Sequence, residues 1–280
     1  MKQYSSLPGP IGVFDSGYGG LTILKKIREV LPMYDYIYLG DNARAPYGSR
    51  SFEVVYHFTL QAVRHLFDQG CYLVILACNT ASAKALRTIQ QKDLPVLDPG
   101  RRVLGVIRPT VEIIGDITHT KHVGVLATEG TISSGSYAME ISKLFGEIKT
   151  KGEACPMWVP LVENNEASSP GADYFVKQHI ERIMKKDPQI DTLVLACTHY
   201  PLLIDKIKEY VPNGVHLLTQ GERVANSLSD YMKRHPEIDA KITKKGRCAF
   251  QTTESSKKFA DNARAFLSFP VKVEQVDIDF

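Results

Sequence analysis

The chain has 280 residues, of which 44% are hydrophobic and 23% charged, and its net charge is +3. This composition is that of a globular protein and excludes a disordered or fibrous one. The lysines are scattered in pairs and form no basic stripe, so we expect no nucleic-acid partner. The longest apolar run, from Cys71 to Cys78, is shorter than the roughly 20 residues that cross a bilayer, so we expect no membrane partner.

The cysteines indicate the compartment. Five of them, an odd number without the spacing of a small disulfide-bonded domain, favour a reducing environment. No Cys-x-x-Cys occurs, so we predict neither a zinc ribbon nor a thioredoxin-type motif. The segment Met1–Pro10 has Pro and Gly where a signal peptide needs its apolar run. We therefore expect a cytoplasmic protein.

The first third of the chain alternates short apolar runs with amphipathic segments. Apolar runs predict strands at 10–14, 34–39 and 73–77, and helical periodicity predicts helices at 21–31, 52–66 and 81–90. A glycine-rich turn, Asp15–Gly20, joins the first strand to the first helix. Regular alternation of this kind predicts an α/β fold with mainly parallel sheets.

Between Leu94 and Arg108, Pro95, Pro99 and Gly100 interrupt the periodicity, which indicates a crossing between two domains. The pattern then restarts. It predicts a strand at 122–126, a helix from Tyr137, a strand-rich stretch at 148–162, a helix at 172–184, and strands near 193–197, 215–218, 247–252 and 271–276, with helices at 224–231 and 259–267. We expect the tail to return to the first domain.

A repeat relates the two halves. Leu73–Thr80 recurs as Leu193–Pro201, and each copy is an apolar run that ends in Ala-Cys. Gly12 and Gly124 are 112 residues apart, and Cys78 and Cys197 are 119 apart, in the same order. We infer two pseudo-symmetric α/β lobes, the first formed by residues 1–102 and 219–280 and the second by residues 103–218, with the site in the cleft between them.

Cys78 and Cys197 stand at the carboxyl ends of predicted buried strands, where an α/β sheet opens to a ligand. A lone cysteine is more often structural, and we assign that role to Cys71, Cys155 and Cys248. Each repeated cysteine precedes a predicted helix N-terminus, which we expect to lower its pKa from about 8.5. Small polar residues follow each one and suit a carboxylate.

Two thiols from two lobes suit the inversion of a stereocentre, because one can remove a proton while the other returns one on the opposite face. No lysine has a pyridoxal-type setting, so we expect no cofactor. Asp15 could reach a substrate ammonium or cap the following helix. His199 could relay protons to Cys197 or be an ordinary histidine. Glu163 could assist or be a loop carboxylate.

Five motifs, in order, carry a resemblance to a known family. They are Asp15-Ser-Gly-x-Gly-Gly20, Pro46-Tyr-Gly48, Ala77-Cys-Asn-Thr-Ala81, Thr128-x-Gly-Thr131 and Ala196-Cys-Thr-His-Tyr-Pro201. Together they resemble glutamate racemase. The resemblance implies a cytoplasmic, cofactor-independent, frequently homodimeric enzyme that interconverts L- and D-glutamate and supplies D-glutamate for peptidoglycan.

The resemblance also implies roles for individual residues. Cys78 and Cys197 would be the proton-transfer thiols, assisted by Asp15, Glu163 and His199. The substrate would be surrounded by Asp15, Ser16, Pro46, Tyr47, Gly48, Asn79, Thr80, Thr128, Thr131, Thr198 and His199. The chain differs from the family at Asp98–Arg102, which looks like an insertion, and at Thr219-Gln-Gly-Glu222, where Asp-Ser-Gly is expected.

Other hypotheses remain open at this point. Racemases that act on aspartate also use two cysteines, and the Thr198-His199 pair favours glutamate. A cysteine hydrolase built on Cys197 and His199 would leave the duplicated thiol idle. A nucleotide- or anion-binding module on Asp15–Gly20 would lack both the Gly-x-Gly-x-x-Gly spacing and a P-loop lysine.

Overall fold

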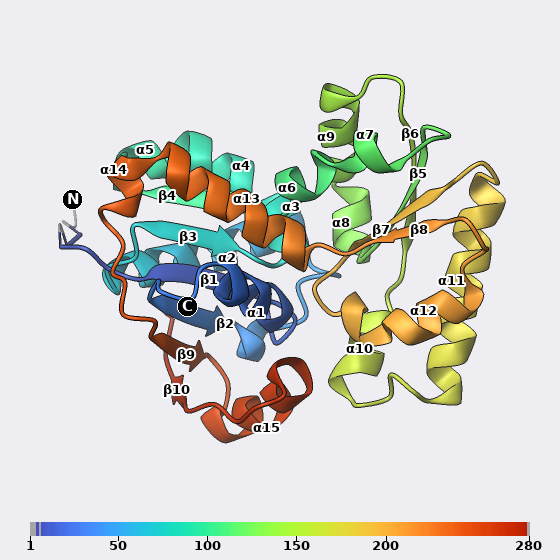
Figure 1. The fold of residues 1–280 in the computed structure, drawn as a ribbon. Coiled ribbons are helices and arrows are strands. Elements are labelled where there is room, and N and C mark those ends of the chain that lie inside the picture. Colours follow the sequence, from blue (N-terminus) through green and yellow to red (C-terminus); the bar gives the residue numbers. More distant parts are fainter. Residues whose placement is uncertain (1–3, 6, 279–280) are drawn as a thin grey trace.

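The computed structural model describes residues 4–5 and 7–278, which form two α/β lobes (Figure 1). The first lobe has a six-stranded sheet in the order β10-β9-β2-β1-β3-β4, and the second has a four-stranded sheet in the order β6-β5-β7-β8. All the strand pairs within the two sheets are parallel. The α/β fold expected from the alternating pattern is therefore confirmed.

The strands of the first sheet are β1 (Ile11–Asp15), β2 (Tyr36–Gly40), β3 (Leu73–Leu76), β4 (Arg102–Gly105), β9 (Cys248–Thr252) and β10 (Val273–Gln275). Those of the second are β5 (His122–Ala127), β6 (Lys149–Ala154), β7 (Thr192–Ala196) and β8 (His216–Leu218).

The helices of the first half are α1 (Leu21–Val30), α2 (Phe52–Asp68), α3 (Asn79–Lys84), α4 (Leu86–Thr88), α5 (Leu94–Leu97), α6 (Ile107–Val111), α7 (Ile114–Ile117), α8 (Glu129–Ser133) and α9 (Ser136–Leu144). Those of the second half are α10 (Trp158–Glu163), α11 (Pro170–Lys186), α12 (Ile204–Tyr210), α13 (Gly221–Arg234), α14 (Pro236–Asp239) and α15 (Ser256–Leu267). A π-helical turn spans Ile89–Asp93, and 3₁₀ turns span Asn42–Arg44 and Tyr200–Leu203.

The two sheets share one topology and one register. In each, the first strand of the lobe lies between the second and the third, and the fourth follows the third, as β2-β1-β3-β4 and β6-β5-β7-β8. Gly12 pairs with Val74, four residues before Cys78, and Gly124 pairs with Leu193, four residues before Cys197. The two cysteines therefore leave equivalent strands at equivalent positions, as an internal duplication requires.

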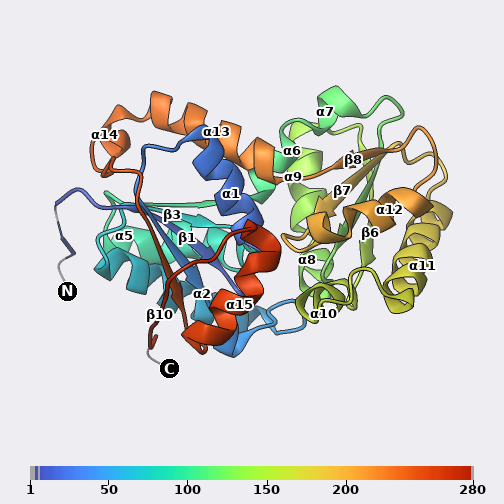
Figure 2. The same cartoon turned by 60° about the horizontal axis from the view of Figure 1, so that its bottom comes forward.

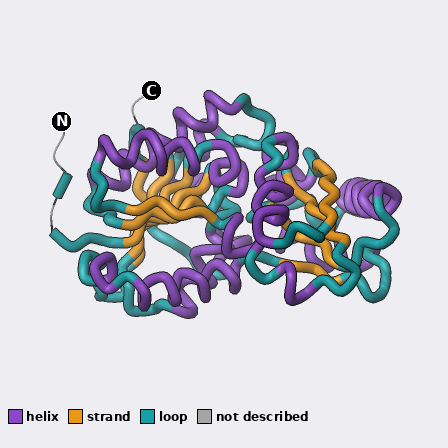
Figure 3. The backbone as a smooth tube through the Cα atoms, turned by 90° about the horizontal axis from the view of Figure 1, so that it is seen from above, coloured by secondary structure: helices purple, strands orange, loops and turns teal. Residues whose placement is uncertain are grey.

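Helices cover both faces of the first sheet, which appears as a layer of strands between two layers of helix (Figure 3). Alternate residues of β1 point to opposite faces. Ile11 and Val13 belong to the core that contains Leu24 of α1, whereas Phe14 belongs to the core that contains Leu66 of α2. Because strand side chains on both faces are buried, the strands read as nearly continuous apolar runs.

Two connections join the lobes, one from β4 to α6 and the other from β8 to α13. The division expected after residue 102 runs through β4, so the first sheet extends to Gly105. Beyond β8 the chain returns to the first lobe, where α13 packs on α1 and β9 pairs with β2. Between β9 and the last strand, β10, the tail forms α15, which lies at the edge of the first lobe beside the second (Figures 1 and 2).

Two local predictions were wrong. The stretch 148–162 is not all strand, because β6 ends at Ala154 and α10 begins at Trp158. Residues 94–97 were expected to break the periodicity but form α5, which tolerates Pro95 in its first turn. Within residues 4–5 and 7–278, no helix is long and apolar enough to span a bilayer.

Candidate active site

Both repeated cysteines line one cavity between the lobes, and each is 6% exposed. Nine of the residues that the resemblance places around the substrate also line it: Ser16, Pro46, Tyr47, Gly48, Asn79, Thr80, Thr128, Thr198 and His199. Glu163 lines it as well. Asp15 and Thr131 do not; both are buried, and each contacts a residue that does.

The cavity has further walls that sequence reasoning missed. They are Ala45, Ser49, Glu129, Pro156, Val159 and Pro160. Val159 and Pro160 belong to α10, which was predicted as strand, so their direction could not be anticipated. Glu129 is the variable residue of the Thr128-x-Gly-Thr131 motif, and its position in that motif was the available signal.

Cys78 lies two residues beyond the end of β3 and is the N-cap of α3. Its Sγ lies 3.5 Å from the Ala81 backbone N–H and 3.5 Å from Ser16 Oγ. Burial, with the negative charge of Asp15, nevertheless raises the pKa of the Cys78 thiol to about 12. The expected lowering of the Cys78 pKa was wrong. The cost of removing the thiolate from water is larger than the stabilisation that one short helix and one hydroxyl give to it.

The surroundings of Cys197 differ from those of Cys78. The chain after it continues through Thr198 and His199 into a 3₁₀ turn, so Cys197 does not stand at the start of an α-helix as predicted. His199 Nδ1 lies 3.9 Å from Cys197 Sγ, and His199 Nε2 lies 2.9 Å from Glu163 Oε1. The two thiols thus have unlike surroundings despite the symmetry of the sheets.

His199 is a buried cation. Burial disfavours the charged ring, but the hydrogen bonds to Cys197 and Glu163 outweigh it and raise the pKa of His199 to about 10. The imidazolium therefore persists across neutral pH and places a proton donor beside Cys197. Phe266 of α15 packs edge-on against the ring, with centroids 5.8 Å apart, and covers it from the first-lobe side.

Asp15 joins the two lobes from beneath the cavity. Its Oδ1 accepts a 2.9 Å hydrogen bond from the Gly17 N–H, and Thr198 Oγ1 donates to its Oδ2 at 3.5 Å. Burial raises the pKa of this carboxyl, although the charge of His199 opposes the shift. A Cβ at Gly19 would lie 2.2 Å from Thr198 Oγ1. The glycine turn is thus what lets the first lobe approach the turn after Cys197.

A buried ion pair holds the loop that carries Tyr47. Asp41 is fully buried and accepts hydrogen bonds from Arg44 Nε at 2.7 Å and Thr253 Oγ1 at 2.8 Å, and another from the Tyr47 hydroxyl. Gly48 O, in the same loop, accepts a 2.7 Å hydrogen bond from the Gly130 N–H of the second lobe. The loop is therefore fixed at both ends and closes one side of the cavity.

Three hydroxyl groups meet where the lobes touch. Thr80 Oγ1 lies 2.9 Å from Thr128 Oγ1 and 3.3 Å from Thr131 Oγ1. Thr80 and Thr128 face the cavity, while Thr131 is buried behind them. Hydroxyl and backbone N–H groups of this kind bind a carboxylate without a positive side chain.

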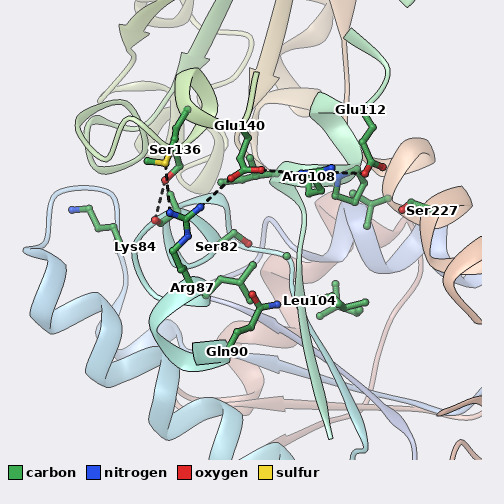
Figure 4. Close-up of a pocket in the computed structure, with 18 of the residues that line it drawn as sticks. Ser82, Lys84, Arg87, Gln90, Leu104, Arg108, Glu112, Ser136, Glu140 and Ser227 are labelled. Carbon is green, nitrogen blue, oxygen red and sulfur yellow. Dashed lines mark hydrogen bonds and ion pairs between the residues drawn. The ribbon is translucent and has the colours of Figure 1, made fainter. Parts of the chain in front are cut away.

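A larger cavity of about 560 Å³ lies between the lobes elsewhere and contains neither thiol (Figure 4). Its walls come from α3, α4, β4, α6, α9 and α13. At its edge the Glu140 carboxylate forms ion pairs with the guanidinium groups of Arg87 and Arg108, each with an N–O distance of 3.3 Å. Because α3 presents Asn79 and Thr80 to the thiol cavity and Ser82 and Lys84 to this one, a single helix separates the two.

Comparison with known proteins agrees with this geometry. Residues 11–228 match the family model described as Asp/Glu/hydantoin racemase. A glutamate racemase of Ruegeria sp. is 36% identical in a match of 274 residues that covers 94% of this chain and 98% of that one. A glutamate racemase of Streptococcus gordonii is 37% identical over 270 residues, 96% of this chain and 98% of that one.

Solved structures give the same result. A Bacillus anthracis glutamate racemase superposes with a TM-score of 0.87 at 34% identity and covers 96% of this chain and 98% of its own. A Francisella tularensis glutamate racemase in complex with D-glutamate superposes with a TM-score of 0.85 at 32% identity and covers 97% and 98%. The chain belongs to the glutamate racemase family, within the Asp/Glu/hydantoin racemases.

Proposed function

We propose that this protein interconverts L- and D-glutamate by proton transfer at Cα, with Cys78 and Cys197 as the two proton-transfer groups. The observation that carries the proposal is that the two thiols, from equivalent strands of the two lobes, line one cavity. The relatives named glutamate racemase, at 36% and 37% identity over nearly the whole chain, support the choice of reaction.

The chemistry balances without another reactant. One cysteine, as thiolate, takes the Cα proton and becomes a thiol, and the electron pair left on carbon is delocalised into the α-carboxylate. The other cysteine, as thiol, gives its proton to the opposite face of the carbon and becomes a thiolate. The product is the other enantiomer, and the two sulfurs have exchanged protonation states, so the return reaction follows the same path.

His199 and Asp15 serve the two thiols unequally. The His199 imidazolium can supply a proton to Cys197, and Glu163 keeps that ring charged and oriented. Asp15 lies near enough to Cys78 for its charge to act on that thiol, and it is linked to the other turn through Thr198. We assign Asp15, Glu163 and His199 to assistance of proton transfer.

Substrate carboxylates would be held by neutral donors. Ser16, Pro46, Tyr47, Gly48, Asn79, Thr80, Thr128 and Thr198 line the cavity, and Thr131 supports the hydroxyl cluster from behind. Oriented N–H and O–H groups stabilise the negative charge that grows on the α-carboxylate as the proton leaves. Two acidic residues, Glu129 and Glu163, line the cavity and are available to a substrate ammonium, whereas Asp15 is buried behind the cavity wall and contacts Thr198.

The proposal also covers the cellular compartment and the oligomeric state of the protein. The resemblance implies a homodimer in the cytoplasm that supplies D-glutamate for peptidoglycan. The five cysteines are all free, which suits a reducing compartment. The mass in solution, measured by light scattering, decides between monomer and dimer.

The decisive experiment is incubation of the purified protein with L-glutamate in heavy water without added cofactor. We expect D-glutamate to form with deuterium at Cα. A folded protein that gives no exchange would falsify the proposal. Parallel assays with aspartate test the substrate, and a higher kcat/KM for aspartate would assign the chain to that reaction instead.

Single substitutions test the two-thiol mechanism. We expect Cys78→Ala and Cys197→Ala each to abolish racemisation in both directions, with Cys248→Ala as a control outside the cavity. A folded single-thiol variant that kept normal turnover would exclude this mechanism. It would also reopen the hydrolase hypothesis if the retained cysteine were Cys197.

A further inference from the structure

Gln220 occupies the second connection between the lobes. It follows β8 and is the N-cap residue of α13, at the point where the chain returns to the first lobe. Its side chain is 3% exposed and does not line the thiol cavity. It belongs to the Thr219–Glu222 segment, where this chain differs from the sequence expected by resemblance. Its long, buried amide therefore requires its own explanation.

The partners of Gln220 come from three separate parts of the fold. Its Nε2 donates to Thr110 Oγ1 at 3.0 Å and to Tyr137 Oη at 2.8 Å. Thr110 belongs to α6, in the first connection between the lobes, and Tyr137 belongs to α9, in the second lobe. One amide thus ties both connections to the body of the second lobe.

The third partner is a wall of the thiol cavity. Asn79 follows Cys78 directly and lines the cavity. Its Nδ2 donates to Gln220 Oε1 at 2.6 Å, and its Oδ1 lies 3.1 Å from Gln220 Nε2, whose two N–H bonds it shares with Thr110 and Tyr137. Tyr137 Oη also donates to Asn79 Oδ1, at 2.7 Å. Two amides that pair reciprocally, with a phenol on the same oxygen, allow Asn79 one orientation.

In this orientation one of the two N–H bonds of the Asn79 side chain remains available to a ligand. Its Nδ2 carries two N–H bonds, and Gln220 Oε1 is the one acceptor that it meets within the described part of the chain. A buried N–H without a partner costs free energy, which a substrate oxygen in the cavity would recover. Without Gln220, the Asn79 amide could rotate and satisfy itself elsewhere.

We propose that Gln220 is a positioning residue that holds the Asn79 amide ready for a substrate carboxylate and couples it to both connections between the lobes. This inference rests on the proposed racemase function. Gln220 touches no reacting atom and acts through Asn79. A carboxylate is charged both in the bound substrate and in the transition state, so a misplaced donor weakens both to a similar degree. The effect of losing Gln220 therefore falls mainly on KM.

The main test is Gln220→Leu, which keeps the approximate volume and removes the hydrogen bonds. We expect KM for both glutamate enantiomers to rise at least about fivefold while kcat stays within about twofold. Gln251→Leu is the matched control, because Gln251 is also 3% exposed and hydrogen-bonded, to His65 and Glu274, but lies outside the cavity. We expect the control to keep both constants within about twofold.

Tyr137→Phe provides an independent route if Gln220→Leu does not fold. It removes the hydroxyl that donates to Asn79 and keeps the ring, so KM should rise in the same direction. In the double variant the two effects should be less than additive, because both act on the same amide. Additive effects would overturn the coupling through Asn79.

Gln220→Glu supplies a readout that a purely structural role would not move. The carboxylate accepts from Asn79 Nδ2 but cannot donate to Asn79 Oδ1 or Thr110, whereas the protonated acid regains one donor. The ratio of its KM to the wild-type KM should fall as the pH is lowered from 9 to 6.

The outcomes separate the two proposals. A wild-type protein without glutamate racemisation would remove the proposed function itself. An active wild type with an unchanged KM in folded Gln220→Leu, an equal rise in Gln251→Leu, or a pH-independent ratio for Gln220→Glu would each overturn the positioning role alone.

Discussion

His199 Nε2 lies 2.9 Å from Glu163 Oε1, so one ion pair joins the turn after β7 to the last residue of α10. The ring is buried, yet this contact and the one to Cys197 raise the pKa of His199 to about 10. In Glu163→Gln the carboxylate charge is lost and burial is not, so we expect the pKa of His199 to fall toward neutrality. Titration of the His199 ring by NMR measures this pKa, and exposed Glu166→Gln, three residues after Glu163, is the control. An unchanged titration in Glu163→Gln would exclude Glu163 as the group that keeps the ring charged.

The same pKa predicts how stability depends on pH. The pKa of His199 is 6.5 when unperturbed and about 10 in the fold, so folding favours the protonated ring. That stabilisation is complete below about pH 6.5 and is lost as the pH rises through about 10. The difference in free energy of unfolding between wild type and His199→Gln should therefore be largest at pH 6 and shrink toward pH 9. Exposed His57→Gln is the control, and a difference that grew with pH would contradict the sign.

Cys78 should be a slow nucleophile in the free protein. Burial, aided by Asp15, raises the pKa of its thiol to about 12, so at pH 8 only about one molecule in 10⁴ carries the thiolate. Alkylation by iodoacetamide, followed by peptide mass spectrometry, should be slower than for a free thiol and should rise about tenfold per pH unit between pH 7 and 10. A rate that levelled off below pH 9 would show a thiolate stabilised in the resting protein.

Asp15 illustrates a conflict between function and stability. Its carboxyl is 1% exposed, and burial raises its pKa, so the charged form is costly in the fold. Asp15→Asn keeps an acceptor for the Gly17 N–H and removes that cost. We expect a melting temperature higher by on the order of 2 °C at pH 7, and kcat lower by about 10² or more. A less stable but fully active variant would show that the carboxylate is structural.

The fold was predictable where one stretch of sequence decides the outcome. β3 and β7 are runs of buried apolar residues, which are recognisable because both faces of a parallel sheet are covered. The helix α10 was not predictable, because Trp158, Val159 and Val162 favour a strand by intrinsic preference. In the structure Trp158, the first residue of α10, packs against Tyr200 at a centroid distance of 4.7 Å. This contact joins segments that are distant in the sequence, so no local pattern reveals it.

The sequence predicted which residues form the site but not their pKa shifts or their hydrogen-bond partners. The repeat paired Cys78 with Cys197, and both line the cavity. The direction of the pKa shift of Cys78 depends on how deeply the assembled lobes bury it, which no local pattern encodes. The role of Gln220 depends on partners at positions 79, 110 and 137, which meet only after both connections have formed.

Glu140 should contribute to the junction of the lobes on the side away from the thiols. It is 19% exposed, belongs to α9, and forms ion pairs with Arg87 of α4 and Arg108 of α6 (Figure 4). It also forms an ion pair with Lys143 of its own helix. Burial opposes ionisation, but Lys143 and Arg108 outweigh it and hold the pKa of Glu140 below its usual value. Its contribution to stability is therefore present above about pH 4.5 and is lost as the pH falls through the lower, folded pKa.

Glu140→Gln removes the charge from this junction and keeps its shape. Because Arg87 and Arg108 are more than half exposed, solvent screening limits the loss to about 1 kcal/mol in the free energy of unfolding at pH 7. Urea unfolding should show the loss shrinking at pH 3.5 and in 0.5 M salt. Glu29→Gln, which breaks the exposed pair with Lys26 within α1, should cost less than about 0.5 kcal/mol. Equal losses in the two variants would mean that Glu140 acts as an ordinary surface charge and does not hold the lobes together.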